Sequence, residues 1–294
     1  MRSLNIPYFD FLGDDDCLYR RLPTDEEVVV ICAKGGSARM VAELLEEKGF
    51  CASYLEQGIQ EWSQFYRPVT VIEEETLKLI QVNRLAKGCL SYMVISGGHE
   101  LAEKTGAVYY ISSGEMQGSE RFYEPLERQG LLRVGHAEVK ILAVPTPGHT
   151  PGSVSVLVND HYLLSGDTIF VGGLGRPDLG GKAAEWAQAL YDTVFTTIAS
   201  LSDEVLVLPT HYADQNEIRQ EGYVGAALGE IRRNNEVMRT VDRDQFTEKV
   251  AHSVGAAPPN YEEIIEINRG VCSVSAEQAT ELEIGPNRCA LHHG

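Results

Sequence analysis

Residues 144–168 read Val-Pro-Thr-Pro-Gly-His-Thr-Pro-Gly-Ser-Val-Ser-Val-Leu-Val-Asn-Asp-His-Tyr-Leu-Leu-Ser-Gly-Asp-Thr, and this stretch decides how the rest of the chain is interpreted. His149 lies in a loop that prolines stiffen and that neighbouring glycines allow to bend sharply. Asp167 follows a short apolar run and a glycine, so we expect its carboxylate at the end of a strand. Downstream, the apolar run at residues 205–208 leads through a proline to His211 in the same way. Because a stiff loop with a histidine beside a strand-end aspartate is typical of a preformed metal site, these three side chains together predict a metal centre.

The same motifs carry a resemblance to a known family. Thr-Pro-Gly-His-Thr-Pro-Gly-Ser (146–153), Ser-Gly-Asp-Thr-Ile-Phe-Val-Gly-Gly (165–173) and Pro-Thr-His-Tyr (209–212) resemble the later metal motifs of the metallo-β-lactamase superfamily. Gly-Gly-Leu-Gly-Arg-Pro-Asp (172–178) is closest to its glutathione-dependent persulfide dioxygenase branch. The resemblance covers about residues 77–294 and implies an α/β fold, the αββα sandwich of this superfamily, lacking part of its N-terminal half.

The first metal motif of the superfamily, His-x-His-x-Asp-His, is absent from this sequence. In the resembling family, several dozen residues that include this motif lie between the strands that we expect at residues 89–96 and 108–111. Here Ser-Gly-Gly (96–98) leads directly to a short helix that begins at His99. We hypothesise an internal deletion between two Ser-Gly-Gly repeats. We interpret His99 as a solvated residue in the first turn of this helix rather than as a replacement ligand.

A second chemical motif lies near the N-terminus. Val-Val-Val-Ile (28–31) is a continuous apolar run, which is typical of a buried strand, and Cys32 follows it directly. A glycine-rich loop (33–37) then leads into a helix that we predict over residues 38–48. Successive loop amides and the positive end of the helix dipole favour a thiolate, and Lys34 adds a positive charge, so we predict a reactive cysteine. The alternative is a buried and inert thiol at a strand end.

This N-terminal unit resembles the C-terminal half of a rhodanese (sulfurtransferase) domain, in which a loop cysteine carries a persulfide. Tyr-Leu-Glu-Gln-Gly-Ile-Gln-Glu-Trp (54–62) looks like the closing strand, turn and helix of that family, whereas Ser37 stands where its loop often has arginine. The opening strand and helix of the family would precede Leu4, so we expect a truncated rhodanese-like α/β unit with unpaired strand edges, compatible with a homo-oligomer. The predicted organisation is a partial rhodanese-like domain at residues 1–67, a linker at 68–76 and a metallo-β-lactamase-fold domain at 77–294.

The predicted set of metal ligands favours a particular metal. Two neutral imidazoles and one carboxylate, with open positions for substrate and oxygen, are typical of non-haem Fe(II). The resemblance implies that iron binds glutathione persulfide through sulfur and activates dioxygen, and that sulfite and glutathione are the products. His149 and Asp167 match two of the three iron ligands of this family, and His211 matches the second-metal ligand of the superfamily. Zinc is the alternative metal.

Three further residues are candidates for binding a persulfide substrate such as glutathione persulfide. Arg176 could clamp a glutathione carboxylate bidentately, or it could form a structural pair with Asp178. Lys34 and Tyr212 are the other two candidates.

Two alternative functions remain open at this point. One is a glyoxalase II-like thioester hydrolase that uses metal-bound hydroxide, and the other is an inactive glutathione- or persulfide-binding remnant. The fused sulfurtransferase unit favours sulfur chemistry.

The composition is that of a globular protein and excludes some classes of partner. The chain has 294 residues, of which 43% are hydrophobic and 23% charged. A net charge of −18 argues against nucleic-acid binding, which needs a basic face. We find no basic-then-apolar leader and no apolar run of membrane-spanning length, so we expect no membrane association. The six cysteines lie far apart without a Cys-x-x-Cys pair, which predicts a reducing, cytoplasmic setting.

Overall fold

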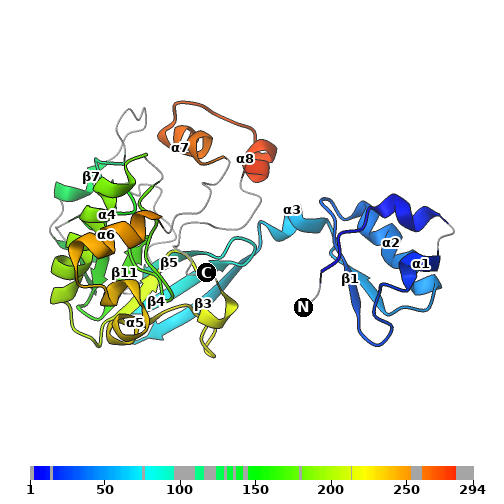
Figure 1. Ribbon diagram of the computed structural model, residues 1–294, viewed down its shortest axis with the longest axis horizontal. Helices are drawn as coiled ribbons and strands as arrows, with labels where there is room; N and C mark the ends of the chain where they lie inside the picture. Colours follow the sequence, from blue (N-terminus) through cyan, green and yellow to red (C-terminus); the bar gives the residue numbers. More distant parts are fainter. Residues whose placement is uncertain are drawn as a thin grey trace. The chain divides into compact units, whose positions relative to one another are not determined.

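The structure, a computed structural model, contains two compact units that both mix helices and strands (Figure 1). One unit comprises Met1–Phe65 with Ala276–Ile284, and the other Tyr66–Ser275 with Gly285–Gly294. No described helix is long and apolar enough to cross a membrane. The structure describes residues 3–13, 16–74, 77–95, 110–115, 124–128, 131–134, 137–141, 145–178, 181–212, 214–252 and 260–282.

The N-terminal unit is built on a two-stranded parallel sheet, β1 with β2, and on helix α2. The buried side chains of Val41 and Leu45 on α2 pack with Phe11 and Leu18 in one apolar cluster. The strand–loop–helix pattern predicted around Cys32 is therefore present. The elements of this unit are η1 (Tyr8–Leu12), α1 (Asp16–Tyr19), β1 (Val28–Val30), α2 (Gly36–Glu47), β2 (Ala52–Tyr54), α3 (Gly58–Trp62) and α8 (Ala276–Leu282).

The described residues of the larger unit form three sheets. The largest has the strand order β13-β12-β11-β10-β9-β8, in which the pair β11–β12 is parallel and the other pairs are antiparallel. The second sheet is the antiparallel β3-β4-β5, and the third is the parallel pair β6–β7. The strands are β3 (Tyr66–Glu73), β4 (Lys78–Arg84), β5 (Cys89–Ile95), β6 (Tyr110–Ile111), β7 (Glu124–Pro125), β8 (Leu131–Val134), β9 (Ala137–Ile141), β10 (Val156–Val158), β11 (Tyr162–Gly166), β12 (Leu206–Pro209) and β13 (Ala226–Ala227).

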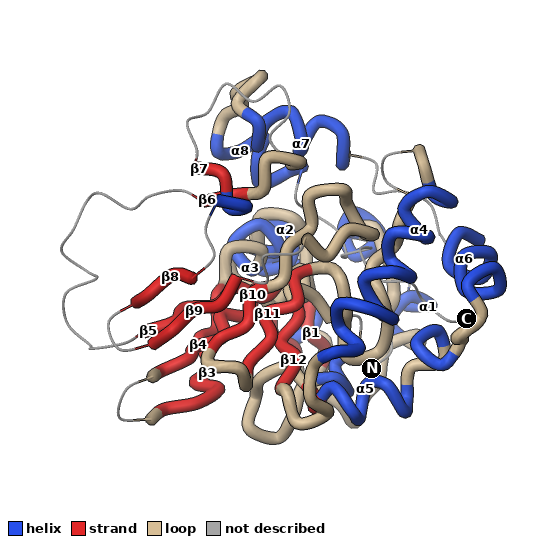
Figure 2. The backbone as a smooth tube through the Cα atoms, turned by 90° about the vertical axis from the view of Figure 1, so that its left-hand side faces the viewer, coloured by secondary structure: helices blue, strands red, loops and turns tan. Residues whose placement is uncertain are grey.

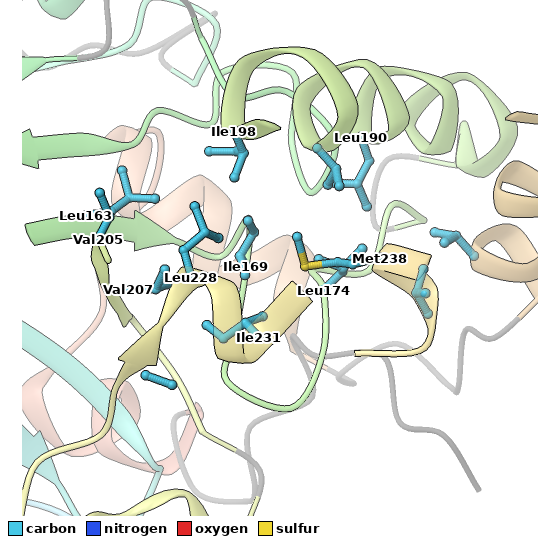
Figure 3. Close-up of a cluster of buried hydrophobic side chains, with 14 of the residues drawn as sticks. Leu163, Ile169, Leu174, Leu190, Ile198, Val205, Val207, Leu228, Ile231 and Met238 are labelled. Carbon is cyan, nitrogen blue, oxygen red and sulfur yellow. The ribbon is translucent and has the colours of Figure 1, made fainter. Parts of the chain in front are cut away.

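Helices of the larger unit lie to one side of strands β9 to β12 (Figure 2). A core of buried side chains fills the space between them, with Leu190 and Ile198 facing Ile169 and Leu228 (Figure 3). The helical elements are η3 (Leu126–Arg128), α4 (Ala183–Asp192), the π-helical turn η4 (Thr193–Thr197), η5 (Ile198–Ser200), η6 (Gln215–Glu217), α5 (Leu228–Asn234), η7 (Val237–Arg239), α6 (Arg243–His252) and α7 (Tyr261–Arg269).

One expectation about the chain's organisation is wrong. Of the stretch predicted to be a linker, residues 68–76, residues 68–73 instead belong to β3, which pairs with β4 along most of its length. The run Val-Thr-Val-Ile (69–72) accounts for this difference, because β-branched side chains favour a pleated, half-buried surface. His99 and residues 96–98, on which the deletion hypothesis rests, lie outside the described residues.

A core substitution tests this packing. Leu228 is fully buried, so Leu228→Ala should lower the free energy of unfolding by about 2–5 kcal/mol through lost burial and a residual cavity. Val241 is 66% exposed, so Val241→Ala should change the same quantity by no more than about 0.5 kcal/mol. Denaturant unfolding measures both. Equal losses in the two variants would contradict the packing described here.

Candidate metal centre

The loop that carries His149 is fixed by helix α4 and by the π-helical turn that follows it. Gly148 has a φ of 151°, and a Cβ atom there would lie 2.5 Å from the Cβ atom of Leu190, so α4 packs directly against the loop backbone. The hydroxyl of Thr193 donates to the carbonyl oxygen of Pro147 at 2.8 Å. π-Helical turns are frequent at functional sites, and this one anchors the loop next to His149, whose side chain is buried.

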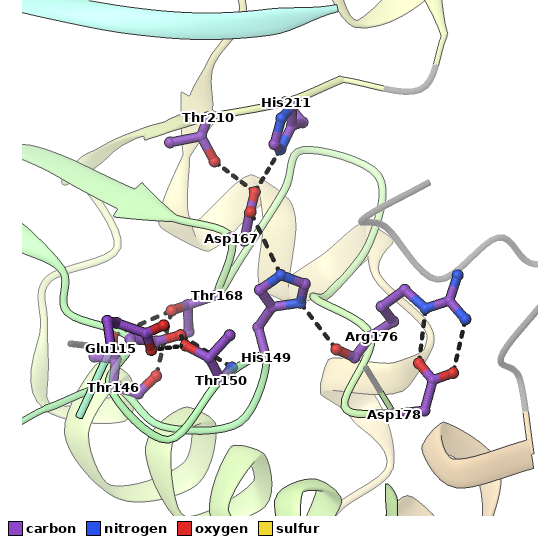
Figure 4. A network of polar contacts seen from close by, with 11 residues as sticks. Glu115, Thr146, His149, Thr150, Asp167, Thr168, Arg176, Asp178, Thr210 and His211 are labelled. Atoms are coloured by element: carbon purple, nitrogen blue, oxygen red, sulfur yellow. Dashed lines mark hydrogen bonds and ion pairs between the residues drawn. The ribbon is translucent and has the colours of Figure 1, made fainter. Parts of the chain in front are cut away.

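The orientation of the His149 ring follows from one hydrogen bond. Its Nδ1 atom lies 2.9 Å from the backbone carbonyl oxygen of Arg176. Because a carbonyl oxygen can only accept, Nδ1 carries a proton, so that Nε2 of the neutral ring presents a lone pair. This Nε2 atom faces Oδ2 of Asp167 at 3.5 Å (Figure 4). A lone pair that faces a carboxylate oxygen favours a cation between the two atoms, and metal-binding histidines typically have their other ring nitrogen fixed in this way.

Asp167 directly follows β11, and two side chains at the end of β12 donate to its Oδ1 atom. The Thr210 hydroxyl and the Nδ1 atom of His211 each lie 2.5 Å from this oxygen (Figure 4). Burial raises the pKa of Asp167, but the hydrogen bond from His211, the charges that His211 and His149 carry when protonated, and the hydrogen bond from Thr210 outweigh it and lower the pKa to about 2. Asp167 is therefore a carboxylate at neutral pH.

The distances test whether these residues fit a metal ion. Nitrogen and oxygen ligands lie about 2.1 Å from zinc, so two ligands of one ion can be up to ~4 Å apart. The 3.5 Å between His149 Nε2 and Asp167 Oδ2 fits two such ligands. His211 Nδ1, at 2.5 Å from Asp167 Oδ1, is instead a hydrogen-bond partner of the carboxylate, and its role as a ligand stays a prediction.

The described residues supply only part of a metal site. Among them, no group of three or more His, Cys, Asp or Glu side chains could hold a metal ion. His149 and Asp167 fit as two ligands. The third ligand has no counterpart in the described part of the chain, which agrees with the absence of the His-x-His-x-Asp-His motif from the sequence.

The predicted substrate-binding residues of this unit have identifiable partners. Arg176 is 3% exposed, and its Nε and Nη2 atoms donate to the two carboxylate oxygens of Asp178, each at 2.7 Å. This is the structural pair that the sequence left open, and binding of a substrate carboxylate by Arg176 stays a prediction. The side-chain amide of Asn83 donates to the hydroxyl oxygen of Tyr212 at 3.4 Å. The backbone amide of Tyr212 donates to the Gly88 carbonyl oxygen.

Cys32 follows β1 in the N-terminal unit, and the backbone of the next loop turns toward its sulfur. The Gly35 amide donates to the sulfur at 3.1 Å. Burial raises the pKa of the Cys32 thiol, but hydrogen bonds from the Ser37 side chain and from the backbone amides of Ala38, Lys34 and Gly35 outweigh it and lower the pKa below its usual value. Lys34 therefore lowers the pKa of the thiol through its backbone amide. The side chain of Lys34 is exposed.

Sequence reasoning missed the residues that hold the candidate ligands in place. Thr210 lies inside the Pro-Thr-His-Tyr motif, and its hydroxyl could have indicated a hydrogen bond to a candidate ligand. The carbonyl of Arg176 carried no such signal, because any residue type supplies a backbone carbonyl. Glu115 contacts the His149 loop from 35 residues away, and nothing in its local sequence indicates this contact.

Two family models match this chain. Residues 95–211 match the Metallo-beta-lactamase superfamily, and residues 2–65 match the Rhodanese-like domain. Both resemblances noted in the sequence are thereby confirmed at the family level.

Curated relatives are similar to parts of the chain. A probable metallo-hydrolase of Bacillus subtilis is 38% identical over 34% of this chain and 44% of its own length. The mitochondrial persulfide dioxygenase of Bos taurus is 39% identical over 22% of this chain and 25% of its own length. A hydroxyacylglutathione hydrolase of a Shewanella strain is 38% identical over 39% of this chain and 38% of its own length. The chain spans less than half of the length of the first curated relatives that it matches.

One solved structure supports the fold. A metallo-beta-lactamase crystal structure from Staphylococcus aureus aligns with a TM-score of 0.51 and 21% identity, covering 70% of this chain and 72% of the other. This likeness confirms the predicted α/β, metallo-β-lactamase-type fold. The chain is therefore similar to a rhodanese-like domain over residues 2–65 and to the metallo-beta-lactamase superfamily over residues 95–211.

Proposed function

We propose that this chain oxidises glutathione persulfide, or another low-molecular-weight persulfide, with dioxygen, and that Fe(II) bound by His149 and Asp167 is the cofactor. The observation that carries the proposal is the position of His149 Nε2, which faces the Asp167 carboxylate at 3.5 Å, with the opposite ring nitrogen held by a backbone carbonyl. The similarity to a persulfide dioxygenase and the fusion to a rhodanese-like domain support sulfur chemistry over other reactions of the superfamily.

The residues of this chain would supply binding and orientation. Bound ferrous iron supplies the redox chemistry that a reaction with dioxygen needs. Asp167 contributes a negative charge that persists at neutral pH, and Thr210 and His211 hold its second oxygen. Glutathione persulfide, dioxygen and water then give glutathione, sulfite and two protons, which balances all atoms.

Cys32 would carry sulfur between persulfides. Its thiolate attacks the outer sulfur of a donor persulfide, a new bond forms between the two sulfurs, and the donor leaves as a thiolate. The amides that donate to Cys32 stabilise this thiolate and support the proposed role.

A second candidate function is thioester hydrolysis of the glyoxalase II type. The similarity to hydroxyacylglutathione hydrolases favours it, and the same two residues would hold a metal that activates water. A third candidate is a glutathione- or persulfide-binding remnant without catalysis, which the incomplete ligand set among the described residues favours.

Oxygen uptake distinguishes these functions. The iron-loaded protein should consume dioxygen with glutathione persulfide and should hydrolyse lactoylglutathione at no more than the background rate. Asp167→Asn should abolish both iron binding and oxygen uptake, because an amide lacks the negative charge that binds the metal. Asp192→Asn removes an exposed carboxylate from α4 and should change neither quantity. Lactoylglutathione hydrolysis without oxygen uptake would establish the second function instead, and the absence of both activities would favour the third.

The thiol of Cys32 provides an independent test. Because its pKa is lowered, the thiolate is populated at lower pH, so alkylation by iodoacetamide should have a pH midpoint below the value of about 8.5 for a free cysteine. Mass spectrometry of the labelled peptides measures this midpoint for Cys32 alone. Cys32→Ala should also abolish sulfur transfer from glutathione persulfide to cyanide, whereas Cys51→Ala, which removes an exposed thiol, should leave it unchanged. A Cys32 midpoint at or above about 8.5 would contradict this role.

A further inference from the structure

The loop that carries His149 has a second anchor, the carboxylate of Glu115. The hydroxyl of Thr150 and the backbone amide of Gly152 both donate to Oε1 of Glu115, the amide at 2.9 Å (Figure 4). Glu115 lies just beyond β6 and is half-buried. A carboxylate is a stronger acceptor than a neutral group, so these two bonds hold the loop more firmly than neutral hydrogen bonds would.

The two backbones also touch at this point. A Cβ atom on Gly152 would lie 2.6 Å from Oε1 and 2.8 Å from the backbone nitrogen of Glu115, and one on Gly114 would lie 2.9 Å from the Cα atom of Gly152. From the other side, Nε of Arg269 at the end of α7 lies 3.4 Å from the Glu115 carbonyl oxygen. Glu115 is therefore fixed both by close packing and by a hydrogen bond to its main chain.

These contacts lead directly to the candidate ligand. Thr150 follows His149 in the chain, and its hydroxyl lies between two partners, Glu115 and the Ser153 hydroxyl at 2.7 Å. Thr193 anchors the other side of the loop through Pro147. His149 thus lies between two anchors, one that comes from α4 and its π-helical turn and one that comes from Glu115.

We propose that Glu115 is a positioning residue for His149, which keeps the loop in the conformation that directs Nε2 toward Asp167. The inference rests on the proposed function in one respect, the binding of metal by His149. Partners that orient a metal-binding histidine typically contribute 10- to 100-fold to metal affinity, so we expect the loss of the Glu115 carboxylate to weaken metal binding by about this factor.

The test uses the chain of residues 1–294 with Co(II) as the probe metal. Glu115→Ala should bind Co(II) about 10- to 100-fold more weakly in competition with a chelator and should show altered visible absorption of the bound ion. Glu115→Gln should lie closer to the wild type, because its amide oxygen can still accept both hydrogen bonds. Thr150→Val removes the donor on the other side and should repeat the effect of Glu115→Ala. Glu230→Ala breaks an exposed ion pair with Arg219 and serves as the matched control.

NMR of the metal-free protein tests the positioning itself. Glu115→Ala should shift the ring resonances of His149, and Glu230→Ala should leave them unchanged, with the far-ultraviolet circular dichroism of both variants matching the wild type. Unchanged His149 resonances in Glu115→Ala would overturn the inference. If Glu115→Ala shifts the His149 resonances but the wild-type chain binds no Co(II), the positioning role is upheld and the proposed function is overturned.

Discussion

The carboxylate of Asp167 is the group on which the arrangement of this site depends. It follows β11, which pairs in parallel with β12, so the ends of both strands meet at one edge of the sheet. Thr210 and His211 donate to one of its oxygens from the end of β12, and the other oxygen faces His149. Because these contacts hold the pKa of Asp167 near 2, the group keeps its negative charge throughout the physiological range. A cation between His149 and Asp167 would balance this charge.

The surroundings of this carboxylate indicate a site that is rigid before any metal binds. The loop of His149 packs against Leu190 on one side and is bound by Glu115 near its other end, and the imidazole is oriented by the Arg176 carbonyl. Such preorganisation lowers the conformational cost of ligand binding, because the ligands lose little freedom when the metal arrives. Among the described residues, this rigid arrangement offers an ion His149 and Asp167 as two ligands in fixed positions.

The parts of this site that follow strands could be predicted from the sequence, and the parts that depend on distant contacts could not. Apolar runs before Asp167 and His211 indicated strand ends, and the prolines and glycines around His149 indicated a stiff loop. The Cys32 loop could be predicted equally well, since an apolar strand followed by glycines and a helix has a local pattern. The expected burial of this strand was wrong, because Val29 in β1 is 55% exposed. Glu115 could not be identified, because its contact with Thr150 depends on the tertiary fold. Part of the stretch predicted as a linker forms the strand β3, whose β-branched side chains favour a pleated surface.

The central claim is that His149 and Asp167 bind one metal ion together. A crystal structure of the protein grown with Fe(II) under anaerobic conditions tests it most directly, with anomalous data collected at the iron edge. The account predicts an anomalous peak about 2.1 Å from Nε2 of His149 and at a similar distance from a carboxylate oxygen of Asp167. An iron peak at other side chains, or no peak with His149 and Asp167 well ordered, would contradict it.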